Sequence, residues 1–66
     1  MNSAHQTLLN WLKKETLFSL VANSSPNTWF LHLEEVSGWI AAEAVATSWE
    51  SACYDLCQQL RAKNLL

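Results

Sequence analysis

The sequence has little positive charge and few residues that break or cross-link a chain. Its 66 residues include four lysines and arginines against six acidic residues, with one glycine, one proline and two cysteines. A nucleic-acid-binding domain normally carries a basic face, because neutralising phosphates supplies most of its affinity. The net charge of −2 and the scattered cations, of which only Lys13 and Lys14 are adjacent, therefore predict that nucleic acid is not a partner.

Long apolar runs are also missing. No segment approaches the roughly 18 to 20 apolar residues that a bilayer-spanning helix needs. Residues 1–5 lack the basic and then apolar layout of a secretory signal. We therefore predict a cytoplasmic protein that has no membrane partner and keeps its two cysteines reduced.

Apolar side chains, and tryptophan above all, are abundant. Half of the residues are apolar and four of them are tryptophan. A chain of this length forms one small domain, residues 1–66, whose core is marginal because only about 60% of its surface is buried on folding. Some indole rings are therefore expected to stay partly exposed, which is typical of a protein-binding surface.

The first half of the chain predicts one helix and two strands. Leu8, Leu9, Trp11 and Leu12 give residues 5–15 the apolar side of a short helix, so that residues 1–14 form an N-terminal helix or extension. Residues 16–22 and 28–33 alternate as strands do, with Phe18, Leu20 and Ala22 on one face and Trp29, Leu31 and Leu33 on one face. The loop formers at 23–27, around Pro26, predict a hairpin between them.

Residues 15–66 are predicted to form a sheet and a helix. Residues 39–46 have the Ala and Glu content of a helix, but Gly38 and Thr47 bound them as a strand. A capping box of Thr47 and Glu50 starts the last helix, whose apolar stripe is Trp49, Cys53, Leu56 and Leu60. We therefore predict an α+β fold, with a three-stranded antiparallel sheet and a packed C-terminal helix. If 34–47 is helical instead, the chain is an all-α adaptor that self-associates as a homo-oligomer.

The sequence has few residues that predict catalysis or metal binding. Cys53 and Cys57 lie four residues apart and lack the tight Cys-x-x-Cys spacing of structural zinc sites. His32 could meet Cys53, but a domain this small leaves no deep pocket for a substrate. Glu34 and Glu35 are interpreted as a charged hairpin turn. We therefore predict no enzyme, no cofactor and no metal.

The tryptophans are the strongest indication of function. Trp29 and Trp39 are ten residues apart, which across one hairpin can bring two indoles onto the same sheet face. Two such rings form a slot for a small apolar side chain, and aromatic anchors contribute about 2 kcal/mol or more each to an interface. The alternative is that both rings belong to the core. A one-residue slip in register moves either ring to the other face.

The segment from residue 15 to residue 66 resembles MbtH-like proteins. Phe18 to Asn23 is similar to their Phe-x-Val-Leu-Val-Asn strand, Trp29 falls on the Trp of Ser-x-Trp-Pro with Phe30 in place of the Pro, and Gly38-Trp39 matches their Gly-Trp. The segment from Leu60 to Leu65, which contains Arg61, resembles their tail. The resemblance implies three antiparallel strands with a packed helix. It also implies a non-catalytic protein that binds the adenylation domain of a non-ribosomal peptide synthetase through a slot of Trp29 and Trp39.

A second resemblance leads to another class of protein. Gly38, followed by the run from Thr47 to Ala52, is similar to HicB-type antitoxins, which have Pro-Gly-Cys and then Thr-Leu-Glu-Glu-Ala. It implies an inhibitor of a small RNA-cleaving toxin. Such toxins are basic, and the acidic balance of this chain is compatible with covering one.

Overall fold

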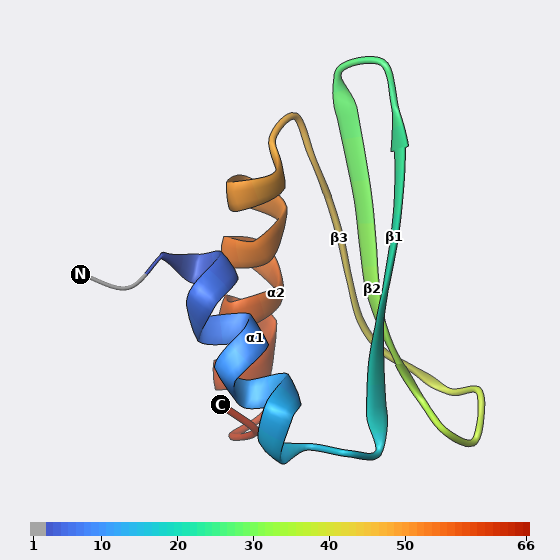
Figure 1. Ribbon diagram of the computed structural model, residues 1–66, viewed down its shortest axis with the longest axis vertical. Coiled ribbons are helices and arrows are strands. Elements are labelled where there is room, and N and C mark those ends of the chain that lie inside the picture. Colours follow the sequence, from blue (N-terminus) through green and yellow to red (C-terminus); the bar gives the residue numbers. More distant parts are fainter. Residues whose placement is uncertain (1–2) are drawn as a thin grey trace.

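Two helices lie on one face of a three-stranded antiparallel sheet in the computed structural model, which describes residues 3–66 (Figure 1). The elements follow one another as α1 (Ala4–Lys14), β1 (Phe18–Ser25), β2 (Thr28–Glu35), β3 (Ile40–Ala46) and α2 (Trp49–Ala62). The predicted α+β fold is thus confirmed. The all-α alternative is wrong, because residues 40–46 pair with β2 along its length.

Helix α1 is fixed by its cap and by an apolar side. The Ser3 hydroxyl accepts a hydrogen bond from the Gln6 amide (3.1 Å), which satisfies one of the donors left free at a helix start. Leu8 and Trp11 are buried, and Lys13 and Lys14 occupy the last turn, where cations suit the helix dipole.

The first hairpin is tighter than the predicted loop over 23–27. Strand β1 continues to Ser25 and β2 begins at Thr28, so only Pro26 and Asn27 form the turn. Asn27 has φ 68°, and Pro followed by a residue of positive φ is the pairing that type II turns prefer. The β1–β2 turn extends beyond the helices at the top of Figure 1.

The turn of the second hairpin is not at Glu34 and Glu35, and the prediction that placed it there is wrong. Both are the last residues of β2, where Glu35 faces Phe18 of β1. The chain turns after them, through Gly38, whose φ of 93° favours glycine. Strand β3 then carries a bulge, because Leu33 is opposite Ala42 whereas Glu34 is opposite Ile40.

The predicted capping box is wrong by one residue. Ser48, not Thr47, caps α2, and its hydroxyl accepts from the Ser51 amide (3.2 Å). Glu50 consequently lies one position too early in the helix to reach back to the cap. Its carboxylate instead accepts a hydrogen bond from the Ala4 amide of α1 (2.5 Å).

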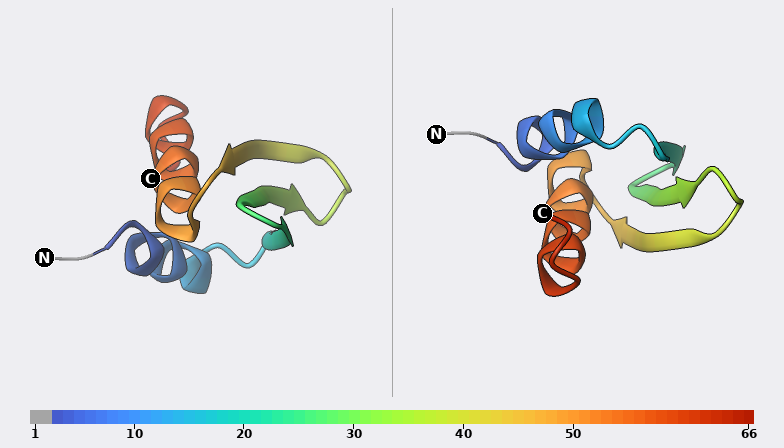
Figure 2. Two further views of the ribbon diagram at one scale, coloured as in Figure 1. Left: turned by 90° about the horizontal axis from the view of Figure 1, so that it is seen from above. Right: turned by 90° about the horizontal axis from the view of Figure 1, so that it is seen from below.

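The core lies in one layer between the helices and the sheet. Figure 2 shows both helices on the same side of the strands. The buried apolar residues come from every element except β1: Leu8, Trp11, Leu31, Leu33, Ala41, Ala42, Ala44, Ala52, Cys53, Leu56, Cys57 and Leu60. The small alanines of β3 allow α2 to approach the sheet closely. Neither helix in the described chain is long and apolar enough to cross a membrane.

Candidate protein-binding surface

Trp29 and Trp39 do not form the predicted slot. Trp29 is opposite Ala46, whereas Trp39 comes just before Ile40, the partner of Glu34 at the other end of the pair. With a rise of about 3.3 Å per residue, the two backbones are roughly 20 Å apart. The slot required a turn at Glu34–Glu35, and the observed turn through Gly38 gives a different register.

Trp29 faces the helices. Its ring packs edge-on against Trp49 of α2 (centroids 5.2 Å apart), and Trp49 meets the ring of His5 at 5.6 Å. All three side chains are half-buried. This aromatic row links α1, α2 and the sheet near the β1–β2 turn, so the alternative in which Trp29 belongs to the core describes it better.

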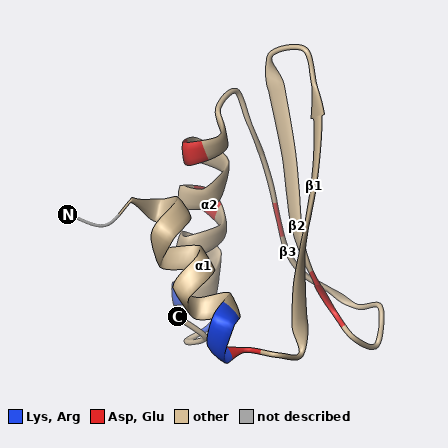
Figure 3. Cartoon of the chain, in the orientation of Figure 1, with Lys and Arg blue, Asp and Glu red and all other residues tan. Residues whose placement is uncertain are grey.

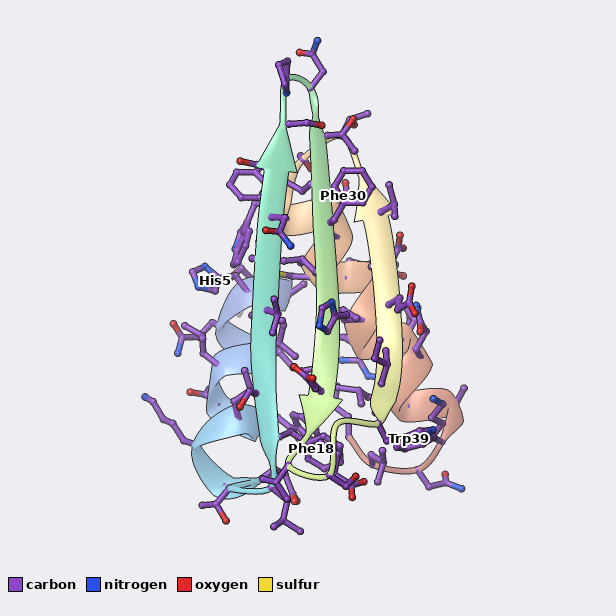
Figure 4. All side chains as sticks on the ribbon, turned by 90° about the vertical axis from the view of Figure 1, so that its right-hand side faces the viewer. His5, Phe18, Phe30 and Trp39 are labelled. Atoms are coloured by element: carbon purple, nitrogen blue, oxygen red, sulfur yellow. The ribbon has the colours of Figure 1, made fainter. Side chains whose placement is uncertain are left out.

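Trp39 is exposed at the opposite end of the molecule. It precedes β3, accepts a backbone hydrogen bond from the Glu35 amide (2.8 Å), and keeps 59% of its surface accessible. The Lys63 ammonium lies 5.8 Å from its ring centroid, within the range of a cation–π contact. In Figure 4 Trp39 lies at the lower end of β3, well away from Phe30.

Phe30 belongs to a patch on the sheet face that points away from the helices. Phe30 is directly opposite Val45, and their exposed fractions are 45% and 60%. The same face carries Ile40, also exposed, and the half-buried Val21. We call Val21, Phe30, Ile40 and Val45 the outer-face patch; no helix or strand formed by residues 3–66 covers it (Figure 4).

Charges are divided between the ends and faces of the molecule. Glu34 and Glu43 lie on the outer face, and the His32 imidazole is 3.9 Å from the Glu34 carboxylate. The four cations, which are scattered in the sequence, gather where α1 and α2 both end, at the bottom of Figure 3: Lys13, Lys14, Arg61 and Lys63. The outer face is therefore apolar with an acidic border.

The other two predicted binding residues, Gly38 and Arg61, have roles within the fold. Gly38 forms the turn before β3, and a Cβ at this position would meet nothing within 4 Å. Arg61 donates to the Gln58 side chain on its own helix (3.2 Å) and lies in the helical layer, behind the sheet. Neither residue lies on the outer-face patch.

Cys53 and Cys57 are packing residues. Both are enclosed under the sheet, and the Cys57 thiol donates to the Ala4 carbonyl (3.6 Å). Burial is the main cause that raises the pKa of Cys53 to about 11 and also raises the pKa of Cys57. Such thiols are poor nucleophiles at neutral pH. Within residues 3–66, no three His, Cys, Asp or Glu side chains cluster as metal ligands would.

A shallow hollow of about 340 Å³ lies between α1 and the last residues of the chain. Its walls carry Trp11, Lys14 and Leu65, among others. The Trp11 indole donates to the Leu65 carbonyl across it (2.7 Å). Its lining contains no carboxylate, histidine or cysteine side chain.

Reasoning from the sequence did not place Val45 and Ile40 on an exposed apolar patch. Their alternation with the alanines of residues 40–46 was the available signal, but it required knowing that this segment is a strand with an uncovered face. Comparison with known protein families, curated proteins and solved structures found no match for this chain.

Proposed function

We propose that this chain is a non-catalytic accessory protein that binds a protein partner through the outer face of its sheet. The observation that supports the proposal is the exposed cross-strand pair of Phe30 and Val45 on a face that the described chain leaves uncovered. A large aromatic ring beside a β-branched side chain offers the kind of anchor that dominates interface energies.

The border of the patch suggests the chemistry of the partner. Glu34 and Glu43 lie on the outer face, whereas the four cations are at the end where the helices stop. Complementary charge suppresses wrong partners and steers association. The proposed partner therefore presents an apolar side chain surrounded by lysine or arginine.

An adenylation domain of a non-ribosomal peptide synthetase is the first candidate partner. It follows from the resemblance to MbtH-like proteins, and the three antiparallel strands with a packed helix agree with the fold which that resemblance implies. Because Trp29 and Trp39 are far apart, the proposal transfers recognition from their slot to Phe30 and Val45. A small basic toxin is the second candidate, and the two carboxylates on the outer face favour it.

A double variant, Phe30→Ser with Val45→Ser, tests the proposal. Tagged wild type and variant are used to capture proteins from lysate of the native host, and mass spectrometry quantifies each captured protein. We expect one dominant partner to be lost from the variant, with at least about a tenfold decrease in affinity, which corresponds to ~1.4 kcal/mol. Tyr54→Ser is the matched control, because Tyr54 is exposed on α2.

The outcomes separate the candidates. A captured adenylating synthetase supports the first, and a captured small basic protein supports the second. Equal recovery of the same partner by the wild type and the double variant contradicts the outer-face proposal. Circular dichroism of the double variant checks that the sheet remains folded.

A further inference from the structure

The two edges of the sheet differ in their protection. The strand order β1-β2-β3 makes β1 and β3 the edge strands. Along β3, the Gln59 side chain accepts from the Glu43 amide (3.3 Å) and donates to the Glu43 carbonyl (2.5 Å), while the Lys63 ammonium donates to the Ala41 carbonyl. The side chains of Gln59 in α2 and of Lys63, just after α2, thus occupy three backbone groups that another strand would need at this edge, and the outward groups of Val45 stay open at its end.

The hydrogen-bonding groups of β1 are open. The backbone amide and carbonyl of Glu43 point away from β2. Because these groups alternate in direction along antiparallel strands, the amide and carbonyl of His32, which is opposite Glu43, point toward β1 and pair with Val21. The residues that alternate with Val21 and its equivalents along β1 are Leu20, Ala22 and Ser24. Their amides and carbonyls therefore point away from β2. Within residues 3–66, neither a side chain nor a loop donates to or accepts from these groups.

Strand β1 also lacks the usual defences of an edge. Its eight residues, Phe18–Ser25, contain no charge and no proline, and all eight pair with β2 without a bulge. Natural edge strands are normally short, charged, bulged or covered, because an open edge pairs with another strand. Within residues 3–66, the bulge lies on β3, and the side chains that cover a sheet edge, Gln59 and Lys63, lie along β3.

We propose that two copies of this chain pair through β1, antiparallel and about a two-fold axis at Val21, to form one six-stranded sheet. In this register Val21 is opposite Val21, Leu20 is opposite Ala22, and Phe18 is opposite Ser24 of the second copy. The open groups of Leu20 and Ala22 then meet across the axis, and Ser24 is opposite Phe18, whose amide already donates to the Glu15 carbonyl (3.3 Å). A register shifted by two residues has its axis at Ala22 and pairs as many residues of β1. The axis at Val21 is favoured because it places two β-branched side chains directly opposite each other, and a shift of one residue brings mismatched backbone groups together.

A second copy fits this edge better than a charged peptide. With no charge on β1, self-pairing opposes no like charges. Antiparallel pairing places the cationic end of one copy beside the uncharged β1–β2 turn of the other, so Lys13 and Lys14 of the two copies stay far apart. Pairing also covers the partly exposed inner face of β1 at Leu20 and Ala22, which a small core leaves unfilled.

The covered β3 edge limits the assembly. Each copy offers one edge that is open along most of its length, and two copies use both, so the contact is isologous and closes at the dimer. The inference does not depend on the proposed function, because β1 pairing leaves Phe30 and Val45 on the outer face.

Charge exchange at Val21 tests the two-fold axis. We expect sedimentation equilibrium of the wild type to give a species of twice the 7.5 kDa chain mass. Val21→Lys alone and Val21→Glu alone oppose like charges, so the dimer dissociation constant rises at least about tenfold. An equal mixture of the two variants restores the dimer. Val45→Lys, on β3 of the same face, stays dimeric and is the matched control.

Amide exchange gives a second measurement. In the wild type, the amides of Leu20 and Ala22 exchange slowly, and in Val21→Lys they exchange quickly while those of Leu31 and Leu33 stay protected in a folded chain. A monomeric wild type at about 0.5 mM, a concentration at which even weak complexes form, overturns the proposal. So does a Val21→Lys variant that remains dimeric, or a wild type that forms open-ended assemblies.

Discussion

The thiol of Cys53 shows how packing alone sets the chemistry of a side chain. It lies in the core, and burial, with a smaller contribution from Glu50, raises its pKa from the ordinary 9.0 to about 11. The thiolate is therefore the disfavoured form in the fold. At neutral pH the fold keeps Cys53 as a neutral packing residue rather than a reactive group.

Stability is predicted to fall in alkaline solution because of this thiol. The unfolded chain releases the proton near pH 9 and the folded chain near 11, so the contribution is complete below pH 9 and is lost as the pH rises toward 11. Two pKa units correspond to roughly 3 kcal/mol. Urea unfolding between pH 8 and 11 measures the loss, and Cys53→Ala should make the decline smaller, with the part due to Cys57 remaining. An equal decline in Cys53→Ala would contradict this role of the thiol.

At the scale of the elements, the turn between β2 and β3 decides which residues share a surface. Gly38 holds φ at 93° with open space around its Cβ position. The turn through Gly38 places Phe30 beside Val45 and separates Trp29 from Trp39. A hairpin that turned at Glu34–Glu35 would instead have brought Trp29 near Trp39 and separated Phe30 from Val45.

Gly38→Ala is predicted to destabilise the fold through the backbone alone. Nothing lies within 4 Å of the added Cβ, so the cost is that of a left-handed conformation, about 1 to 2 kcal/mol. Chemical denaturation of Gly38→Ala and of the neighbouring Ser37→Ala measures it. We expect a shift of the midpoint in the first only. Equal midpoints for both variants would show that the turn tolerates a change of conformation.

The sequence predicts the elements well because each has a local cause. The alternation of Leu31 and Leu33 with polar neighbours, the apolar stripe of α2 and the Pro26 turn are all read within about ten residues. The register between strands, in contrast, depends on where a turn begins, and a change of one or two residues rearranges every pair. The contact of Trp29 with Trp49 depends on how α2 lies across the sheet, which no local pattern encodes.

On the scale of the whole molecule, residues distant in sequence close the structure. Ala4 contacts Glu50 and Cys57 through its amide and carbonyl, and the Trp11 indole donates to the Leu65 carbonyl. Helix α1 packs mainly on α2, and it reaches the sheet through Trp11, whose ring lies 5.2 Å from that of Phe18. Helix α1 is therefore part of the core, and the last residues of the chain are tied to it by a hydrogen bond although Leu65 itself stays exposed.

The arrangement of the two helices also gathers the positive charge at one end of the molecule. Both helices end at one side of the molecule, so the cations of their last turns, Lys13, Lys14 and Arg61, become neighbours in space although they are far apart in sequence. Each stabilises the carbonyl end of its helix dipole. The cations therefore share one end of the molecule, whereas the acidic residues are spread over the sheet, α2 and the segment after α1.

Loss of a single side chain from α1 is predicted to unfold the helices and the sheet together. Leu8 is completely enclosed in the core, and Leu8→Ala at such a site costs about 2 to 5 kcal/mol. A domain of this length has only about 3 to 10 kcal/mol of total stability. Urea unfolding followed by far-ultraviolet dichroism and by tryptophan fluorescence should give coincident curves with a much lower midpoint.

Leu17→Ala is the matched control, because Leu17 keeps 56% of its surface exposed and should change stability by no more than about 0.5 kcal/mol. If α1 were an independent extension, Leu8→Ala would lower the helical signal while the tryptophan signal of the Trp29–Trp49 contact kept its original midpoint. Separate transitions would thus contradict a shared core. Coincident transitions are expected because Leu8 packs in the same buried cluster as Leu33 of the sheet and Leu56 of α2.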